Sequence, residues 1–156
     1  MAANKKPRRK YRPRAANVLS AFDAISRKLP MNNGQRLDLG IAYHVALDEM
    51  IHGRGTEVHW STVVCALNIA LLLAEQGYGA NHLGIIKAAL DGAVRSRKRA
   101  ELIGRWGFDG DALVDVKIAL ETHDSQMAIV SQAEIRAVLS EMHKRIDNGN
   151  VLREAA

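Results

Sequence analysis

An apolar run near the middle of the chain, VVCALNIALLLA from Val63 to Ala74, constrains the fold more than any other segment. Asn68 is the only polar residue in the run, so a helix formed here has no polar face to turn toward water. The run has twelve residues, whereas a helix needs roughly 20 apolar residues to span a bilayer. We therefore predict a core helix, from about Glu57 to Gln76, that other elements surround.

The residues on both sides of this run repeat apolar side chains at the spacing of helices. Aromatic residues make up only 4% of the chain, and helix formers outnumber β-branched residues, which favours helices over sheets. Further helices are predicted over about residues 17–28, 35–52, 81–103, 112–130 and 132–147. Glycine-containing turns separate most of them, and Thr56, Asp109 or Asp111, and Ser131 are suited to cap the helices that follow. The predicted fold is all-α, a compact bundle of five to six helices.

A length of 156 residues predicts one folded domain with short ends attached to it. Residues 1–14 have no apolar periodicity and contain two prolines, so they are predicted to form a basic arm that is disordered or extended. Residues 15–150 are assigned to the helical bundle domain and residues 151–156 to a C-terminal tail. The apolar core helix would also suit the interface of a homodimer.

Cys65 is the only cysteine, and it lies inside the apolar run. A single cysteine can form neither an internal disulfide nor a Cys-based zinc site. We expect a buried, unreactive thiol in a reducing compartment. No apolar stretch follows the basic N-terminus, so no secretory signal is expected. A cytoplasmic location is the prediction, with no membrane association.

Positive charge is segregated along the chain. The net charge is +5, but the first fourteen residues hold seven Lys/Arg and no Asp/Glu, which leaves 15 cations against 17 acids in the remainder. A second group of five cations between residues 95 and 105 contains a single acid, Glu101. Such asymmetry is typical of proteins that contact a polyanion, most often nucleic acid. A solubilising tail and a solvated helix face are the alternatives.

We predict that both groups bind the phosphates of DNA or RNA without strong sequence preference. The arm residues of this predicted site are Lys5, Lys6, Arg8, Arg9, Lys10, Tyr11, Arg12 and Arg14. The residues of the second group are Arg95, Arg97, Lys98, Arg99 and Arg105. Arginine can fork onto phosphate oxygens, and Tyr11 could stack on a base. Trp106 and Phe108 could stack bases as well, although packing onto the bundle is the favoured interpretation for both.

Other chemistry finds less support in the sequence. His44, Asp48 and His52 share one helix face and could ligate a metal, but no second unit of a di-iron motif follows, so no metal or cofactor is predicted. The chain lacks a nucleophile elbow and a phosphate-binding glycine loop, so no catalytic residues are assigned and an enzyme is not expected. A helix-turn-helix built on residues 112–147 offers only Gln132 and Arg136 for reading bases, which is weak support.

Three segments, KPRRKYRP, HGRGTEVHWSTVVCALNIA and LETHDSQMAIVSQAEI, resemble small uncharacterised proteins encoded by bacteriophages and prophages of proteobacteria. The resemblance covers most of the chain and carries no catalytic residues with it. It implies an accessory or host-modulating protein. The leading hypothesis is therefore a non-catalytic, phage-type protein that binds nucleic acid, or a complex containing it, through the basic arm.

The alternative hypothesis is a protein-binding module that inhibits or redirects a host complex. Its working surface would be the polar stripe of His44, Asp48 and His52 together with His59. In that case the arm would dock on an acidic protein surface or on nucleic acid held by the partner.

Overall fold

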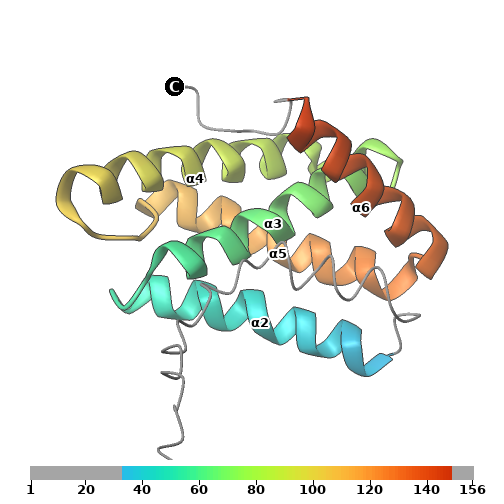
Figure 1. Ribbon diagram of the computed structural model, residues 1–156, viewed down its shortest axis with the longest axis horizontal. Helices are drawn as coiled ribbons and strands as arrows, with labels where there is room; N and C mark the ends of the chain where they lie inside the picture. Colours follow the sequence, from blue (N-terminus) through green and yellow to red (C-terminus); the bar gives the residue numbers. More distant parts are fainter. Residues whose placement is uncertain (1–32, 149–156) are drawn as a thin grey trace, which may run out of the picture.

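The computed structural model describes residues 33–148, and within that range it contains helices and no strand (Figure 1). The elements are α2 (Asn33–Ile51), α3 (Glu57–Glu75), a short 3-10 helix η1 (Ala80–His82), α4 (Leu83–Ile103), α5 (Gly110–Ile129) and α6 (Gln132–Asp147). The all-α prediction is confirmed, and the predicted bounds of these helices agree with the structure to within about two residues. The predicted helix over residues 17–28, the arm and the tail lie outside the described residues.

Local capping chemistry explains where several helices begin and end. The Thr56 hydroxyl accepts a hydrogen bond from the backbone N–H of His59 at the start of α3. Ser131 and Glu134 form a reciprocal capping box that starts α6. Gly104 ends α4 with a φ of 71°, a left-handed conformation that glycine adopts without strain. The caps expected from the sequence at Thr56 and Ser131 are thus confirmed.

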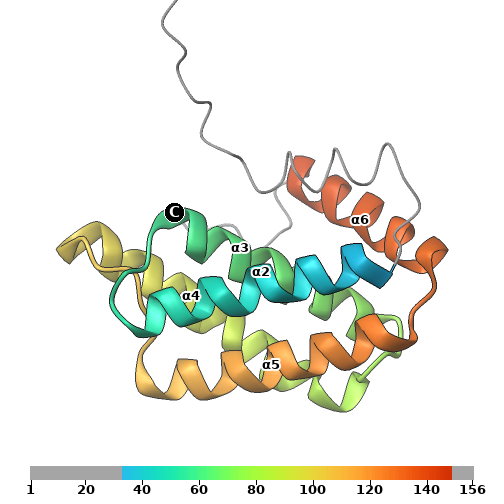
Figure 2. The same cartoon turned by 90° about the horizontal axis from the view of Figure 1, so that it is seen from below.

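Helix α3 occupies the centre of the bundle, where it contacts α2, α4, α5 and α6 (Figures 1 and 2). Among the described helices it alone is long and apolar enough, by length and composition, to cross a membrane. More than half of it is buried inside the fold, as expected for a core helix of similar composition. The prediction that other elements surround this segment is confirmed.

Two apolar clusters hold the helices together. The larger one joins α2, α3, α4 and α5 through side chains such as Leu67, Leu90 and Leu120, all essentially inaccessible to water. The smaller one joins α3 to α6 through Ile69, Leu139 and neighbours. Because both faces of α3 are covered, its apolar composition needs no membrane or partner to explain it.

Two loops pack on each other at one end of the bundle. A Cβ atom added to Gly55, in the α2–α3 loop, would lie 2.4 Å from the backbone oxygen of Trp106 in the α4–α5 loop. The rings of Trp60 and Trp106 lie 5.7 Å apart between centroids. Trp106 and Phe108 are half-buried and pack against the larger cluster, which confirms the packing interpretation for both. This contact holds the loop that follows the cationic end of α4.

Candidate nucleic-acid interface

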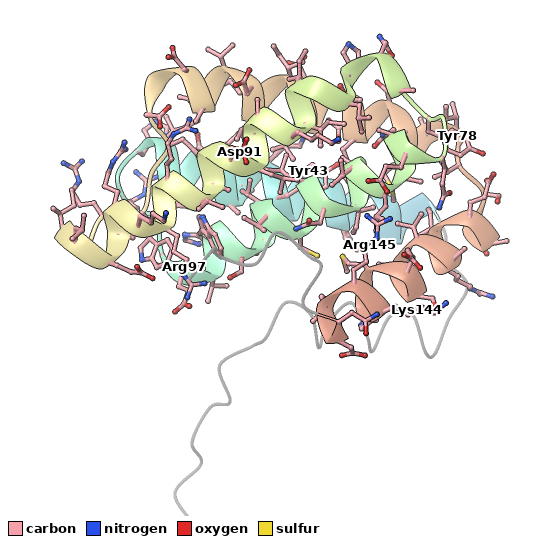
Figure 3. The ribbon with its side chains drawn as sticks, turned by 90° about the horizontal axis from the view of Figure 1, so that it is seen from above. Tyr43, Tyr78, Asp91, Arg97, Lys144 and Arg145 are labelled. Carbon is pink, nitrogen blue, oxygen red and sulfur yellow. The ribbon has the colours of Figure 1, made fainter. Side chains whose placement is uncertain are left out.

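The second cationic group predicted from the sequence gathers at the C-terminal end of α4 and the start of the next loop, a region we call the α4 end (residues 95–105). Figure 3 labels Asp91 and Arg97 along this helix. Arg95, Lys98 and Leu102 are spaced three and four residues apart, so they share the outer side of α4. The opposite side, with Ile86 and Leu90, faces the core.

Two of the five cations are tied to Asp109, the N-cap of α5. The Nε atom of Arg95 lies 3.0 Å from Asp109 Oδ2, and Arg99 Nη2 lies 3.9 Å from the same oxygen. The other oxygen, Oδ1, accepts a hydrogen bond from the backbone N–H of Ala112. The hydrogen bond from Arg95, followed by the one from Ala112, lowers the pKa of Asp109 below its ordinary value. Asp109 thus caps a helix and orients two arginines at once.

Arg97 contributes to packing as well as charge. Its guanidinium carbon lies 5.5 Å from the centroid of the Trp60 ring, and its Nε atom lies 3.2 Å from a carboxylate oxygen of Glu101. A guanidinium over an indole face gains a cation–π interaction. Its side chain is also more covered than those of Arg95 and Arg99. Three arginines of this group form a described ion pair, and Arg97 is the least accessible of the three.

Lys98 and Arg105 differ from the three arginines just described. Both are exposed, and neither forms an ion pair with any residue between positions 33 and 148. Arg105 follows the turn at Gly104 and reaches toward Gly53 in the α2–α3 loop. The α4 end thus offers two unpaired cations, together with Arg95, whose side chain is about half-exposed although it is paired.

Two large apolar side chains at the α4 end are also exposed, and sequence analysis did not single them out. Leu102 is 85% exposed and Ile103 is 61% exposed. The position of Leu102 around the helix was the one signal in the sequence for its exposure. It lies on the same side of the helix as Arg95 and Lys98, and not on the side of Ile86. That signal could not show whether a neighbouring helix covers this position.

The structure places the second predicted group together, whereas the predicted arm residues, from Lys5 to Arg14, lie outside the described residues. The assignment of both groups to nucleic-acid binding stays a prediction.

The polar stripe on α2 forms a separate feature. His44 Nε2 lies 2.8 Å from Asp124 Oδ2 on α5, and the Tyr43 hydroxyl donates a hydrogen bond to Asp124 Oδ1. His52 pairs instead with Asp48, one turn away on the same helix. Within residues 33–148 no three His, Cys, Asp or Glu side chains are placed to hold one metal ion. The link to Asp124 was not foreseen, because about 80 residues separate the partners.

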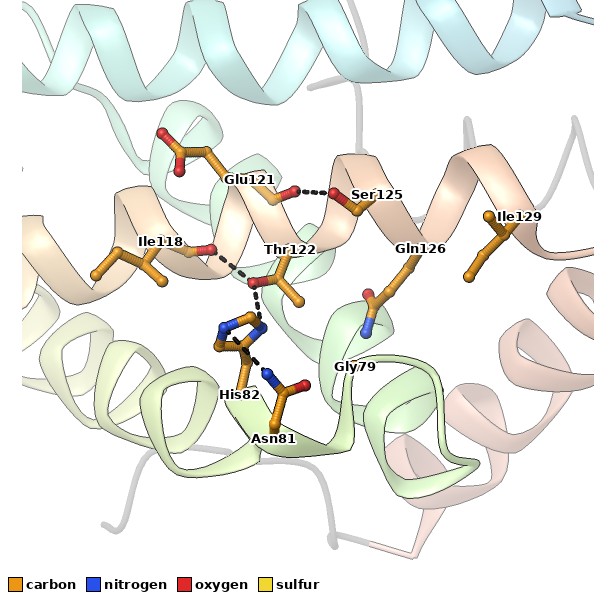
Figure 4. Close-up of a pocket in the computed structure, with 9 residues that line it drawn as sticks. All are labelled: Gly79, Asn81, His82, Ile118, Glu121, Thr122, Ser125, Gln126 and Ile129. Carbon is orange, nitrogen blue, oxygen red and sulfur yellow. Dashed lines mark hydrogen bonds between the residues drawn. The ribbon is translucent and has the colours of Figure 1, made fainter.

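A surface pocket of about 450 Å³ lies between η1 and α5 (Figure 4). Several of its polar side chains already bond within the protein. Thr122 Oγ1 lies 3.3 Å from His82 Nδ1 and donates to the backbone oxygen of Ile118, while Gln126 donates to the backbone oxygens of Ala70 and Tyr78. The pocket's hydrogen bonds therefore hold η1 and the end of α3 against α5.

Cys65 lies in the smaller apolar cluster. Burial raises the pKa of its thiol to about 12, so the thiol is protonated at neutral pH. The expectation that this cysteine is buried is confirmed, and its low reactivity stays a prediction.

Comparison of the chain with protein-family models, with curated proteins and with solved structures gives no match in any of the three. The resemblance to phage-encoded proteins consequently stays a prediction.

Proposed function

We propose that this protein binds nucleic acid through electrostatic contacts, without catalysing a reaction, and that the basic arm and the α4 end supply those contacts. The observation that carries the proposal is charge segregation. Residues 1–14 contain seven cations and no acid, whereas residues 33–148 contain 12 Lys/Arg and 15 Asp/Glu. Such an arrangement gives a chain with an acidic body an oriented attraction to a polyanion.

The α4 end supports the same proposal from the folded body. Lys98 and Arg105 are exposed and unpaired within the described residues, and Arg95 is held at the surface by Asp109. Phosphate contacts from a few such residues add to those of an arm, because each cation that meets a phosphate releases condensed counterions. The proposed ligand is DNA or RNA of any sequence, and the phage-type accessory role remains part of the proposal.

The test is to replace the seven Lys/Arg residues of the arm with Gln in the full-length chain and to measure binding of a labelled duplex and a labelled single strand by fluorescence anisotropy. We expect log affinity of the natural chain to fall with log salt by about 0.9 per phosphate contact for the duplex and about 0.7 for the single strand. The arm variant should bind at least about 100-fold more weakly at low salt and show a shallower salt slope.

A matched control removes positive charge elsewhere. Lys117, Arg136 and Lys144 are exposed and lie outside both cationic groups. Per charge removed, their replacement by Gln should lower affinity far less than replacement of the seven arm residues does. An equal loss per charge removed in the two variants would show that net charge, and not the arm, drives association, and an unchanged affinity in the arm variant would overturn the proposal.

A protein-binding module is the second candidate, and the outer face of α2 favours it. Ile41 and Val45 lie one turn apart on this face and are both about half-exposed, next to Asp48 and His52. Exposed apolar side chains flanked by polar ones are typical of docking surfaces. A partner that copurifies in stoichiometric amount after nuclease treatment, and is lost on replacing Ile41 and Val45 with Ser, would establish this function instead.

A further inference from the structure

The end of α4 presents large apolar side chains and protrudes from the bundle. Nucleic-acid binding by charge alone requires neither feature. The last two residues of the helix, Leu102 and Ile103, are large, apolar and exposed. The chain then turns away at Gly104, whose backbone N–H donates to the oxygen of Ala100. In Figures 1 and 2 this end of α4 projects beyond the turn between α2 and α3. The two side chains therefore stand at a protruding tip of the bundle.

Cations outnumber acids around this apolar tip, where Glu101, paired with Arg97, is the acid next to Leu102. Lys98 lies one turn before Leu102, Arg95 lies two turns before it on the same side, and Arg105 follows the turn at Gly104. A ligand that fits this pattern has an apolar interior bordered by negative charge. Double-stranded nucleic acid has that pattern, because stacked bases lie between two lines of phosphates.

We propose that Leu102 and Ile103 form an apolar wedge that inserts between stacked base pairs of duplex DNA while Arg95, Lys98 and Arg105 contact the flanking phosphates. This inference depends on the proposed nucleic-acid binding and adds how the duplex is engaged. Leucine and isoleucine are among the side chains that wedge into base steps from the minor groove, partly unstacking and bending the duplex. The cost of unstacking is offset by burial of the two aliphatic side chains and by the added phosphate contacts.

Two other occupants fit the tip less well. A helix that lies in a membrane surface needs an apolar face along its length. The outer side of α4 instead carries Asp91 and Arg95 before Leu102, and its apolar side is buried in the core. A second copy of this chain docked by two-fold symmetry would bring the two cationic tips together, which like charges oppose.

The experiment uses a duplex of about two helical turns with 2-aminopurine placed at a TA step, a step that is easily unstacked. Fluorescence of 2-aminopurine rises when its stacking is lost, and anisotropy of an end label reports affinity in the same samples. The variant replaces Leu102 and Ile103 with Ser. The matched control replaces Val114 and Ile129, two exposed apolar residues of α5, with Ser.

With the natural chain and with the control we expect saturable binding and a rise in 2-aminopurine fluorescence. The tip variant should lose most of that rise and bind about tenfold more weakly, because the transfer of two aliphatic side chains out of water is lost. All three proteins should unfold at closely similar temperatures, since the replaced residues are exposed.

The two proposals fail in distinguishable ways. Binding without a fluorescence rise, or an equal rise with the tip variant, overturns the wedge and leaves nucleic-acid binding intact. Absence of DNA binding by the natural chain at low salt overturns the wedge, and absence of both DNA and RNA binding overturns both proposals. Binding to vesicles that contain phosphatidylserine is measured as a further test. If the natural chain sediments with the vesicles, the tip variant does not, and DNA is not unstacked, the tip binds a lipid surface. That result overturns the wedge.

Discussion

Helix α3 and the end of α4 both carry large aliphatic side chains, but of these two regions only the apolar run of α3 packs them into the core formed by residues 33–148. Leu67, in α3, is fully buried among four helices, whereas Leu102, in the last turn of α4, is 85% exposed. In α3 most apolar side chains join other helices, and Val58, in its first turn, is the exposed exception. At the α4 end the same residue type faces water between cations. Apolar composition therefore reports the core in one region and suggests a contact surface in the other.

The same substitution in the two regions should give the largest contrast. Leu67→Ala removes buried methyl groups and leaves a cavity, so we expect a loss of about 2–5 kcal/mol in the free energy of unfolding. Leu102→Ala should change it by less than about 0.5 kcal/mol, because an exposed side chain has little packing to lose. Urea unfolding followed by circular dichroism at neutral pH measures both. Similar losses at the two positions would show that the α4 end is covered in solution.

The pH dependence of stability should likewise originate in the interior. His123, on α5, is fully buried, and desolvation lowers its pKa from 6.5 to about 4. The hydrogen bond with Gln126 and the charge of Asp124 oppose this shift, while His44 adds to it. Because the unfolded chain binds a proton first, stability is complete above about pH 6.5 and is lost as the pH falls toward 4.

We expect this loss to reach at most about 3 kcal/mol between pH 6.5 and 4, from about 1.4 kcal/mol per unit of pKa. Urea unfolding across that pH range measures it, and His123→Gln should flatten the dependence. His52, which is exposed, supplies the control, since His52→Gln should leave the curve close to that of the natural chain. A wild-type chain equally stable at pH 6.5 and pH 4.5 contradicts a neutral, buried His123.

The contrast between the two regions also explains which structural features could be predicted from the sequence. Helix bounds and the caps at Thr56 and Ser131 depend on residues a few positions apart, and these were predicted closely. The core position of α3 followed from an apolar run that has no polar face. Each of these features is set by local chemistry or by one helix considered alone.

The features that were not predicted depend on how helices meet. Asp109 or Asp111 was expected as a helix cap, but the pairing of Asp109 with Arg95 and Arg99 requires the loop to fold back on α4. The bond between Tyr43 and Asp124 joins positions about 80 residues apart. Exposure of Leu102 depends on how far α4 extends past its neighbours. Periodicity within one helix contains none of this information.

Close packing of α4 on α5 holds the exposed end against the core, and two glycines of α4 test it with a smaller expected effect. A Cβ atom on Gly92 would lie 2.5 Å from the Cβ of Ala112, whereas one on Gly84 would meet no atom within 4 Å. Gly92→Ala should therefore lower the free energy of unfolding by about 1–3 kcal/mol, because the helices must separate. Gly84→Ala should raise it by up to about 1 kcal/mol, since alanine loses less backbone entropy in a helix. If Gly92→Ala proved as stable as Gly84→Ala, the two helices would have to lie farther apart than described here, and the α4 end would lose its rigid support.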